Sequence, residues 1–234
     1  MKKISESEKE RYSKFISLPE MGEEGQLKLK NSKILVIGAG GLGSAVLPVL
    51  AAAGIGTMGV VEHDTVELSN LQRQIIYTPA DVGKKKLNIA CEYLQKINPE
   101  LEIISFDTRF EEKNAEELIR KFDLVLDCTD NYKTRYLIND TCSKLKKSLI
   151  YASVNDYEGQ VVVLHHKQNT NLRDLYPEIP DDHENNRILP TLPQIIGSIQ
   201  ANETIKVLTN RGNILDGQLL IFNIYANSFQ IVNI

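Results

Sequence analysis

KILVIGAGGLGSAVLPVLAAAG, residues 33–54, is the stretch of this 234-residue chain that decides the fold. Its first six residues form a short apolar run closed by a glycine, which predicts a buried parallel strand. Residues 42–54 then predict a helix, in which Pro48 removes one backbone hydrogen bond, so we expect a kink or a loosened turn there. The segment therefore predicts a strand, a glycine turn and a helix.

The same alternation continues through the first 150 residues. Further strands are predicted at residues 57–62, 101–106 and 123–127, and further helices at residues 83–98, 111–121 and about 133–144. Because strands that alternate with helices form parallel sheets covered on both faces, we expect an α/β fold of the Rossmann-like type.

The last third of the chain changes character. Strands are predicted at residues 159–166, 217–224 and 228–234, around a helix at residues 193–210, and we expect them to extend the sheet with antiparallel strands. Residues 167–190 carry three prolines without periodicity and predict a long crossover loop. We therefore expect an N-terminal helical segment, residues 1–30, and a single domain, residues 31–234.

Composition excludes several classes of protein. The net charge of −4 is spread without a long single-sign block, so no nucleic-acid partner is expected. The N-terminus is charged, and no run approaches the roughly 18 apolar residues of a membrane span, so a cytoplasmic location without a membrane is expected. The three cysteines form no Cys-x-x-Cys pair, so neither a disulfide framework nor a zinc site is expected.

The glycine turn GAGGLG follows a strand and opens a helix, the context in which backbone N–H groups hold phosphate. Its glycines are Gly38, Gly40, Gly41 and Gly43. Glu62 lies 19 residues beyond the last of them, where it can accept hydrogen bonds from ribose hydroxyls. These features alone fit a nicotinamide or flavin oxidoreductase.

The segment EHDTVELSNLQRQ, residues 62–74, points to a triphosphate instead. Arg73 offers a planar donor fork to phosphate oxygens, and Asn70 and Gln74 add neutral donors. A nicotinamide site does not need this concentration of donors, whereas attack on a triphosphate requires its charge to be neutralised.

Two further residues extend the predicted site. Lys86 begins a helix and can reach the same phosphates, unless it is one solvated member of the lysine run at residues 84–86. In DCTDN, residues 127–131, Asp130 is a candidate magnesium ligand, while Asp127 can instead cap the next helix.

At these residues the sequence resembles the ThiF/MoeB/HesA family, relatives of the ubiquitin-activating enzymes. The motifs are GAGGLG, DTVELSNLQRQ, GKKK, INPELEI, VLDCTDN, EGQVVV and IIGSIQANETIK, and the likeness runs from about Arg11 to the C-terminus. The resemblance implies ATP-dependent adenylation of the C-terminal glycine of a small ubiquitin-like sulfur-carrier protein ending in Gly-Gly, for thiamine or molybdopterin synthesis, with thiamine slightly favoured.

The resemblance also implies residue roles. Gly41 would approach the phosphates, Glu62 would hold the ribose where the family more often has Asp, and Asp130 would coordinate Mg²⁺. Arg11 would reach the partner subunit's site within a homodimer. The remaining implied contacts to the nucleotide are Ser69, Asn70, Arg73, Gln74, Lys86 and Asn131.

This sequence departs from the family where many members carry zinc-binding Cys-x-x-Cys pairs and a cysteine after the crossover loop, so it resembles a zinc-free type. We expect the protein to stop at the acyl adenylate and to leave sulfur transfer to another enzyme. Cys128 beside Asp127 is expected to pack rather than react. The loop at residues 167–190 is expected to receive the carrier's tail, unless it is a linker.

Two other classes of function stay open from the sequence. A nucleotide-dependent oxidoreductase would account for the glycine turn and Glu62 but would leave Asp130 idle. A non-catalytic carrier-binding subunit would retain the fold, but the phosphate-side residues are all present.

Overall fold

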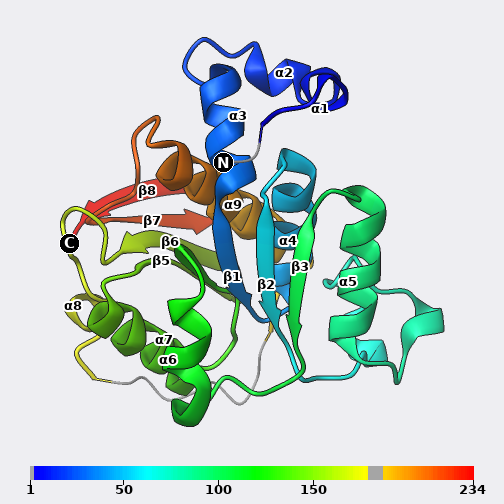
Figure 1. Ribbon diagram of the computed structural model, residues 1–234. Helices are drawn as coiled ribbons and strands as arrows, with labels where there is room; N and C mark the ends of the chain where they lie inside the picture. The colour runs from blue at the N-terminus through cyan, green and yellow to red at the C-terminus, as the bar shows by residue number, and fades with distance from the viewer. Residues whose placement is uncertain (1–2, 179–186) are drawn as a thin grey trace.

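The computed structural model describes residues 3–178 and 187–234 of the chain and contains one eight-stranded sheet. The strand order is β3-β2-β1-β4-β5-β6-β7-β8 (Figure 1). The strands are β1 Lys33–Ile37, β2 Thr57–Val61, β3 Glu102–Phe106, β4 Leu124–Asp127, β5 Ser148–Asn155, β6 Glu158–Leu164, β7 Gln218–Asn223 and β8 Ser228–Asn233. The first five pair in parallel and the last three antiparallel, which confirms the predicted fold class.

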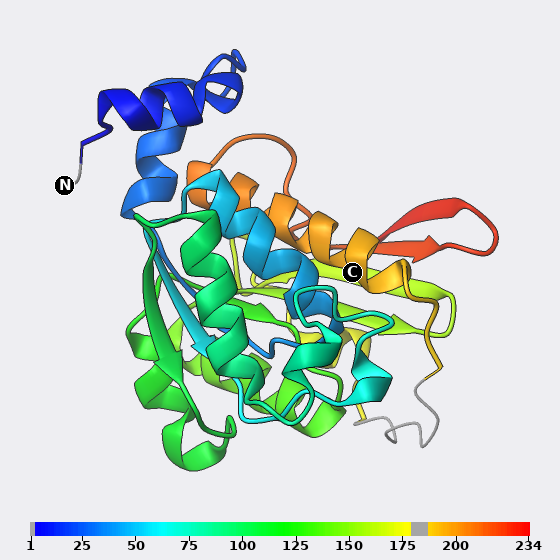
Figure 2. The same ribbon diagram turned by 90° about the vertical axis from the view of Figure 1, so that its right-hand side faces the viewer.

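Helices cover both faces of the sheet, as Figure 2 shows. They are α1 Glu6–Arg11, α2 Ser13–Ile16, α3 Gly22–Asn31, α4 Gly41–Ala53, α5 Lys86–Ile97, α6 Glu112–Arg120, α7 Tyr132–Leu145, α8 Leu172–Leu175 and α9 Leu192–Thr209, with 3₁₀ turns η1 Leu68–Asn70 and η2 Pro79–Asp81. Alternate residues of β1 lie on opposite faces of the sheet. Ile34 and Val36 join the core under α4, α5 and α9, whereas Leu35 and Ile37 join the core under α6 and α7.

The glycine turn brings β1 and α4 into close contact. Gly38 has φ +97°, a conformation that side-chain-bearing residues rarely adopt. A Cβ on Gly43 would lie 2.4 Å from the carbonyl oxygen of Gly38, so only glycine fits there. After this turn α4 runs as one continuous helix through Pro48 and ends at Gly54, which has φ +89°.

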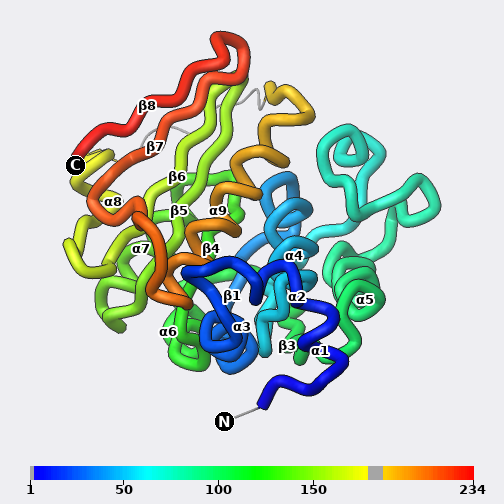
Figure 3. Tube along the Cα trace, turned by 90° about the horizontal axis from the view of Figure 1, so that it is seen from above, coloured from blue at the N-terminus to red at the C-terminus, as the bar shows by residue number. Residues whose placement is uncertain are grey.

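The N-terminal helices α1 to α3 lie at the amino ends of the parallel strands (Figures 1 and 3). Tyr12, between α1 and α2, is buried, and its hydroxyl accepts a hydrogen bond from the side-chain amide of Asn98 at 3.3 Å. The same amide donates to the carbonyl of Ala51 at 2.9 Å. These contacts hold the N-terminal segment against the end of the sheet away from the strands' carboxyl ends.

Some elements differ from those predicted. The strand β5 was not expected, because its apolar run, residues 149–152, is too short for periodicity to distinguish strand from helix. Helix α5 begins at Lys86 rather than at residue 83, after a turn in which Gly83 has φ +84°. The expected loop at residues 167–190 contains the short helix α8, capped by the Asn171 side chain, and its residues 179–186 lie outside the described part of the chain.

Candidate active site

A cavity of about 410 Å³ opens at the carboxyl ends of the parallel strands. It lies where β1 is paired with β2 on one side and with β4 on the other, so that the chain leaves these strands in opposite directions. Ligands of open α/β sheets bind at such a point. The volume is within the range of small-molecule sites.

The glycine turn forms one wall of this cavity. Gly38, Gly40 and Gly41 line it, whereas Gly43 is occupied by the packing against Gly38 described above. Gly40 is the N-cap of α4 and has no side chain that could accept a hydrogen bond from the first N–H groups of this helix. The helix start is therefore equipped to receive phosphate oxygens.

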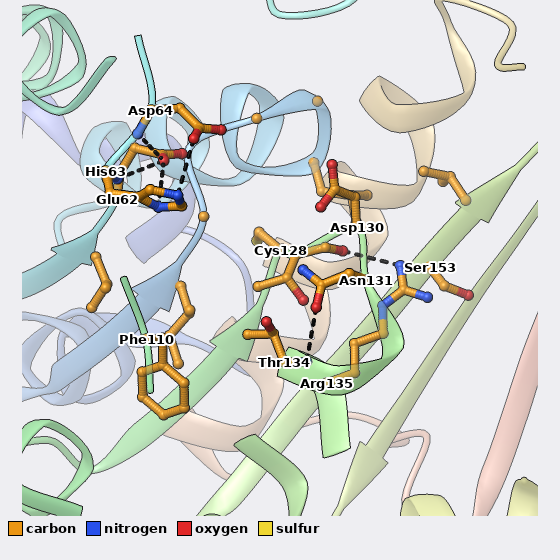
Figure 4. Close-up of a pocket in the computed structure, with 18 of the residues that line it drawn as sticks. Glu62, His63, Asp64, Phe110, Cys128, Asp130, Asn131, Thr134, Arg135 and Ser153 are labelled. Carbon is orange, nitrogen blue, oxygen red and sulfur yellow. Dashed lines mark hydrogen bonds and ion pairs between the residues drawn. The ribbon is translucent and has the colours of Figure 1, made fainter. Parts of the chain in front are cut away.

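Glu62 is buried at the end of β2 and lines the cavity (Figure 4). Its carboxylate accepts three backbone hydrogen bonds, from the N–H groups of Ala39 at 2.9 Å, His63 at 2.7 Å and Asp64 at 2.9 Å. Three backbone donors fix the orientation of this carboxylate. Its contact with a ribose stays a prediction.

Lys86 is only 5% exposed although it carries a charge. Its Nζ lies 3.4 Å from Oδ2 of Asp64, whose side chain is half-exposed, and His63 Nε2 lies 3.1 Å from Oδ1 of the same carboxylate. Lys86 is thus not one member of a solvated lysine run, because it is buried, lines the cavity and pairs with the Asp64 carboxylate. This position suits a group that binds phosphate.

The segment after β2 contributes two of its expected residues to the cavity. Arg73 and Gln74 line it, and Oε1 of Gln74 is buried without a hydrogen-bond partner among the described residues. Nη1 of Arg73 donates to the carbonyl of Ser69 at 3.0 Å. Gln74 therefore brings an unsatisfied polar atom to the edge of the cavity.

Ser69 and Asn70 lie behind this wall and are not among the residues that line the cavity. Oδ1 of Asn70 accepts the backbone N–H of Glu67 at 3.1 Å, which closes the turn η1. In this structure both residues shape the turn that presents Arg73. The direct phosphate contacts that the resemblance implies for them stay predictions.

Asp130 and Asn131 follow β4 and line the opposite wall from Glu62 (Figure 4). No ion pair involves Asp130 in the part of the chain that the structure describes. Asn131 has a structural role, since its Oδ1 accepts the N–H of Thr134 at 2.9 Å and caps α7. The alternative in which Asp127 caps this helix is wrong, because Asp127 is fully buried and binds Thr129 instead.

Arg11 lies away from the cavity of its own chain. Its Nη2 donates to the carbonyl of Ile97 at 2.6 Å, and its guanidinium lies over the ring of Tyr12, 5.7 Å from the centroid. Arg11 ends helix α1, which lies at the amino ends of the strands (Figure 1), whereas the cavity is lined by residues at their carboxyl ends. Action on a partner subunit's site stays a prediction.

Cys128 lines the inner wall but is buried, and its Sγ lies 3.4 Å from Oε1 of Gln200 as a hydrogen-bond donor. Burial raises the pKa of this thiol well above its usual range, and the neighbouring Asp127 adds to the effect. A thiol held protonated is a poor nucleophile, so Cys128 is suited to packing.

Several residues of the cavity escaped the sequence analysis. They come from the loop after β3, from α7, from the end of β5, from the segment before α9 and from the first turn of α9: Thr108, Arg109, Phe110, Glu111, Arg135, Ser153, Val154, Asn155, Arg187, Ile188 and Pro193. The position directly after a parallel strand is the signal that could have found the first group. The residues at the end of β5 could have been found only if β5 had been predicted as a strand.

Among the described residues, no helix is long and apolar enough to cross a membrane. One group of side chains, Glu62, His63 and Asp64, offers ligand atoms within 4.8 Å of one another. Mg²⁺ prefers oxygen ligands, and the Glu62 oxygens already accept three backbone hydrogen bonds. Asp130 offers carboxylate oxygens and forms no ion pair among the described residues, so it fits this metal better than the group around Glu62 does.

Solved structures support the fold. A structure of PaaA superposes with a TM-score of 0.84 at 24% identity, covering 100% of this chain and 76% of that one. The structure of MccB from E. coli with ATP gives a TM-score of 0.83 at 20% identity, covering 95% of this chain and 71% of that one.

Curated relatives are more similar in sequence. The "Sulfur carrier protein adenylyltransferase" of Thermus thermophilus is 40% identical over 97% of this chain and 87% of its own length. The "Probable molybdopterin-synthase adenylyltransferase" of Porphyra purpurea is 43% identical over 94% of this chain, and "Adenylyltransferase and sulfurtransferase MOCS3" of Culex quinquefasciatus is 40% identical over 97%. The chain spans only 59% and 53% of the length of these last two relatives.

The model of the ThiF family matches residues 12–234, which is nearly the whole chain. The match includes the glycine turn, the Arg73 segment and the Asp130 loop that together surround the cavity. The chain belongs to the ThiF family.

Proposed function

We propose that this protein adenylates the C-terminal carboxylate of a small sulfur-carrier protein with ATP and releases pyrophosphate. The observation that carries the proposal is the convergence of the uncapped start of α4, Arg73, Lys86 and Asp130 on one cavity. The names of the relatives from Thermus and Porphyra support the same chemistry.

The reaction needs positioning and charge stabilisation more than a protein nucleophile. A carboxylate oxygen of the carrier attacks the α-phosphorus in line, a new C–O–P linkage forms, and the bond to the β-phosphate breaks with its electrons on the leaving pyrophosphate. Arg73 and Lys86 lie where they can bind the phosphate oxygens and stabilise this charge. The N–H groups at the start of α4 add donors without a net charge.

Mg²⁺ would neutralise charge on the phosphates when bound, and Asp130 would be its protein ligand. The fit rests on the carboxylate oxygens of Asp130, which line the cavity without an ion pair among the described residues. Glu62 would orient the ribose from the opposite wall, because its own carboxylate is held by three backbone donors.

The carrier's tail would enter beside Ser153, Asn155 and Arg187, on the side of the cavity nearest the segment before α9. An extended Gly-Gly end suits this approach because glycine has no side chain to obstruct the backbone. Assembly as a homodimer, with Arg11 acting on the partner subunit, belongs to the same proposal. Whether the carrier serves thiamine or molybdopterin synthesis stays a prediction from the sequence.

ATP–pyrophosphate exchange tests the proposal. The wild-type protein should incorporate labelled pyrophosphate into ATP only when a carrier ending in Gly-Gly is present, and a carrier shortened by these two residues is the matched control. Arg73→Ala should lower exchange by at least about a hundredfold, the usual cost of losing a donor to developing charge. Absence of exchange with ThiS-like and MoaD-like carriers alike would contradict the proposal, and stabilisation by NAD but not by ATP would favour an oxidoreductase.

A further inference from the structure

Arg135 is a charged residue buried beside the cavity that the proposed reaction has not used. It lies in the first turns of α7, is 6% exposed and lines the cavity near Ser153 (Figure 4). Its guanidinium lies over the rings of Tyr132, at 5.1 Å, and Tyr151, at 5.7 Å from the centroids. A buried arginine is costly unless it is held by specific partners.

The partner that Arg135 holds is the peptide immediately before Asp130. Nη2 of Arg135 donates to the carbonyl oxygen of Thr129 at 3.0 Å. On the other side, Oδ1 of Asp127 accepts the N–H of Thr129 at 2.9 Å and its hydroxyl at 2.7 Å. Thr129 is thus held by a carboxylate at its N–H and by a guanidinium at its carbonyl.

Arg135 also acts electrostatically on the buried carboxylate of Asp127. Asp127 is fully buried, and its Oδ2 has no hydrogen-bond partner among the described residues. Burial raises the pKa of Asp127, and the charge of Arg135 opposes that shift. No ion pair joins the two side chains within the described structure, so Arg135 supports the Asp127 carboxylate at longer range.

We propose that Arg135 is a positioning residue that, by fixing the Thr129 carbonyl, holds the Asp130 carboxylate in the cavity for a divalent cation. The chain of contacts is short, because Asp130 directly follows the peptide that Arg135 binds. The hydrogen bond from the Thr134 N–H to the Asn131 side chain closes the other end of the loop, so that Asp130 lies between two fixed points. This inference rests on the proposed function only for the assumption that the cation binds together with the phosphates of ATP. The contacts of Arg135 are independent of that function.

Metal binding provides the direct test. Mn²⁺ replaces Mg²⁺ and is titrated by electron paramagnetic resonance into protein with ATP and without carrier, so that no turnover occurs. Arg135→Met and Asp130→Asn should each weaken Mn²⁺ binding by about tenfold or more, the usual cost of disturbing a residue that orients a metal ligand. The double variant should lose no more than Asp130→Asn alone, because both changes act on one contact.

Two further variants separate positioning from general stability. Arg135→Lys keeps the charge but not the planar fork, so it should restore only part of the Mn²⁺ affinity. Arg120→Met, at an exposed arginine on α6, should bind Mn²⁺ like the wild type and serves as the matched control. Thermal unfolding of each variant shows whether it is folded at the assay temperature.

Wild-type Mn²⁺ affinity in folded Arg135→Met would overturn the inference, as would additive losses in the double variant. Failure of both Arg135 variants to fold would overturn it too, since the residue would then act on stability. The proposed function is judged separately by wild-type exchange activity. A protein without exchange that loses Mn²⁺ in both single variants would keep the positioning role and reject adenylation.

Discussion

The Nζ of Lys86 lies 3.4 Å from Oδ2 of Asp64, and the backbone N–H of Lys86 donates to the carbonyl of Asp64 at 3.0 Å. This double contact joins the start of α5 to the loop after β2, and both residues line the cavity. It places a buried cation against a carboxylate that is itself half-exposed. A phosphate group in the cavity can therefore replace Asp64 as the partner of the Lys86 ammonium group, because the Asp64 carboxylate is then still exposed to solvent.

Lys86→Met is expected to lower exchange by about a hundredfold or more, because it removes a cation that stabilises charge on the phosphates. Asp64→Asn is the matched change on the other side of the pair and should cost far less, since it keeps the Lys86 cation and the backbone hydrogen bond from Lys86 to the carbonyl of residue 64. Pyrophosphate exchange at saturating carrier measures both. Equal losses in the two variants would mean that the pair acts as a structural unit.

Gly43→Ala is expected to destabilise the protein by about 1 to 3 kcal/mol, the usual cost of overpacking, because its Cβ would lie 2.4 Å from the Gly38 carbonyl oxygen. Gly25→Ala in α3 is the control, since its nearest neighbour would be 3.5 Å away and alanine favours the helix. Urea unfolding gives both values. A Gly43 variant as stable as the wild type would show that the β1–α4 contact yields easily.

Stability should fall as the pH drops below about 6.5, the ordinary histidine pKa. Burial lowers the pKa of His165 in the folded protein, against the opposing influence of Asn139, Asp140 and Asp174. The unfolded chain therefore binds a proton before the folded chain does, and this part of the stability is complete above about pH 6.5 and is lost as the pH falls toward the folded pKa.

His165→Asn isolates this effect because asparagine tolerates the φ of +53° at that position. The variant should have lower stability at neutral pH, since it loses the 2.9 Å contact between Nε2 and Asn139 Oδ1, but a weaker dependence on pH. Unfolding in urea at pH 7.5 and 5.5 measures the difference. His166, whose pKa burial also lowers, is present in both proteins and cancels from the comparison.

Cys128→Ala should keep most of the exchange activity, because burial holds the thiol protonated and away from nucleophilic chemistry. Iodoacetamide should leave Cys128 and the buried Cys142 unlabelled in the folded protein. Mass spectrometry before and after unfolding reads out the labelling. A carrier adduct released by thiols and lost in Cys128→Ala would contradict this expectation and the prediction that the protein stops at the acyl adenylate.

The sequence predicted four of the five parallel strands, β1 to β4, because apolar residues dominate each of them. It also predicted that Arg73, Gln74, Lys86 and Asp130 would share one site, and all four line the cavity. Strand β5 was missed because its pairing with β4 and β6, not its composition, makes it a strand. The local uses of Asn70 and Asn131 were missed for a similar reason, since a capping bond depends on backbone geometry that residue type alone does not give.

Arg135 also could not be predicted as a residue of the site from the sequence. Nothing in its spacing separates it from a solvated helix residue, and only the fold places it between two tyrosine rings and the Thr129 carbonyl. Burial of a charge is a property of the assembled molecule. Sequence reasoning finds such a residue only after the neighbouring strands are known.

The cavity between β1 and β4 is walled by segments that lie more than a hundred residues apart, from Gly38 to Pro193. No short fragment of the chain contains it, so the proposed nucleotide site requires the whole sheet to be assembled. ATP should consequently raise the unfolding midpoint of the entire domain and not of one part. Protease cleavage between α4 and α9 that disassembles the sheet would abolish nucleotide binding. Bound ATP would therefore report complete folding in every variant.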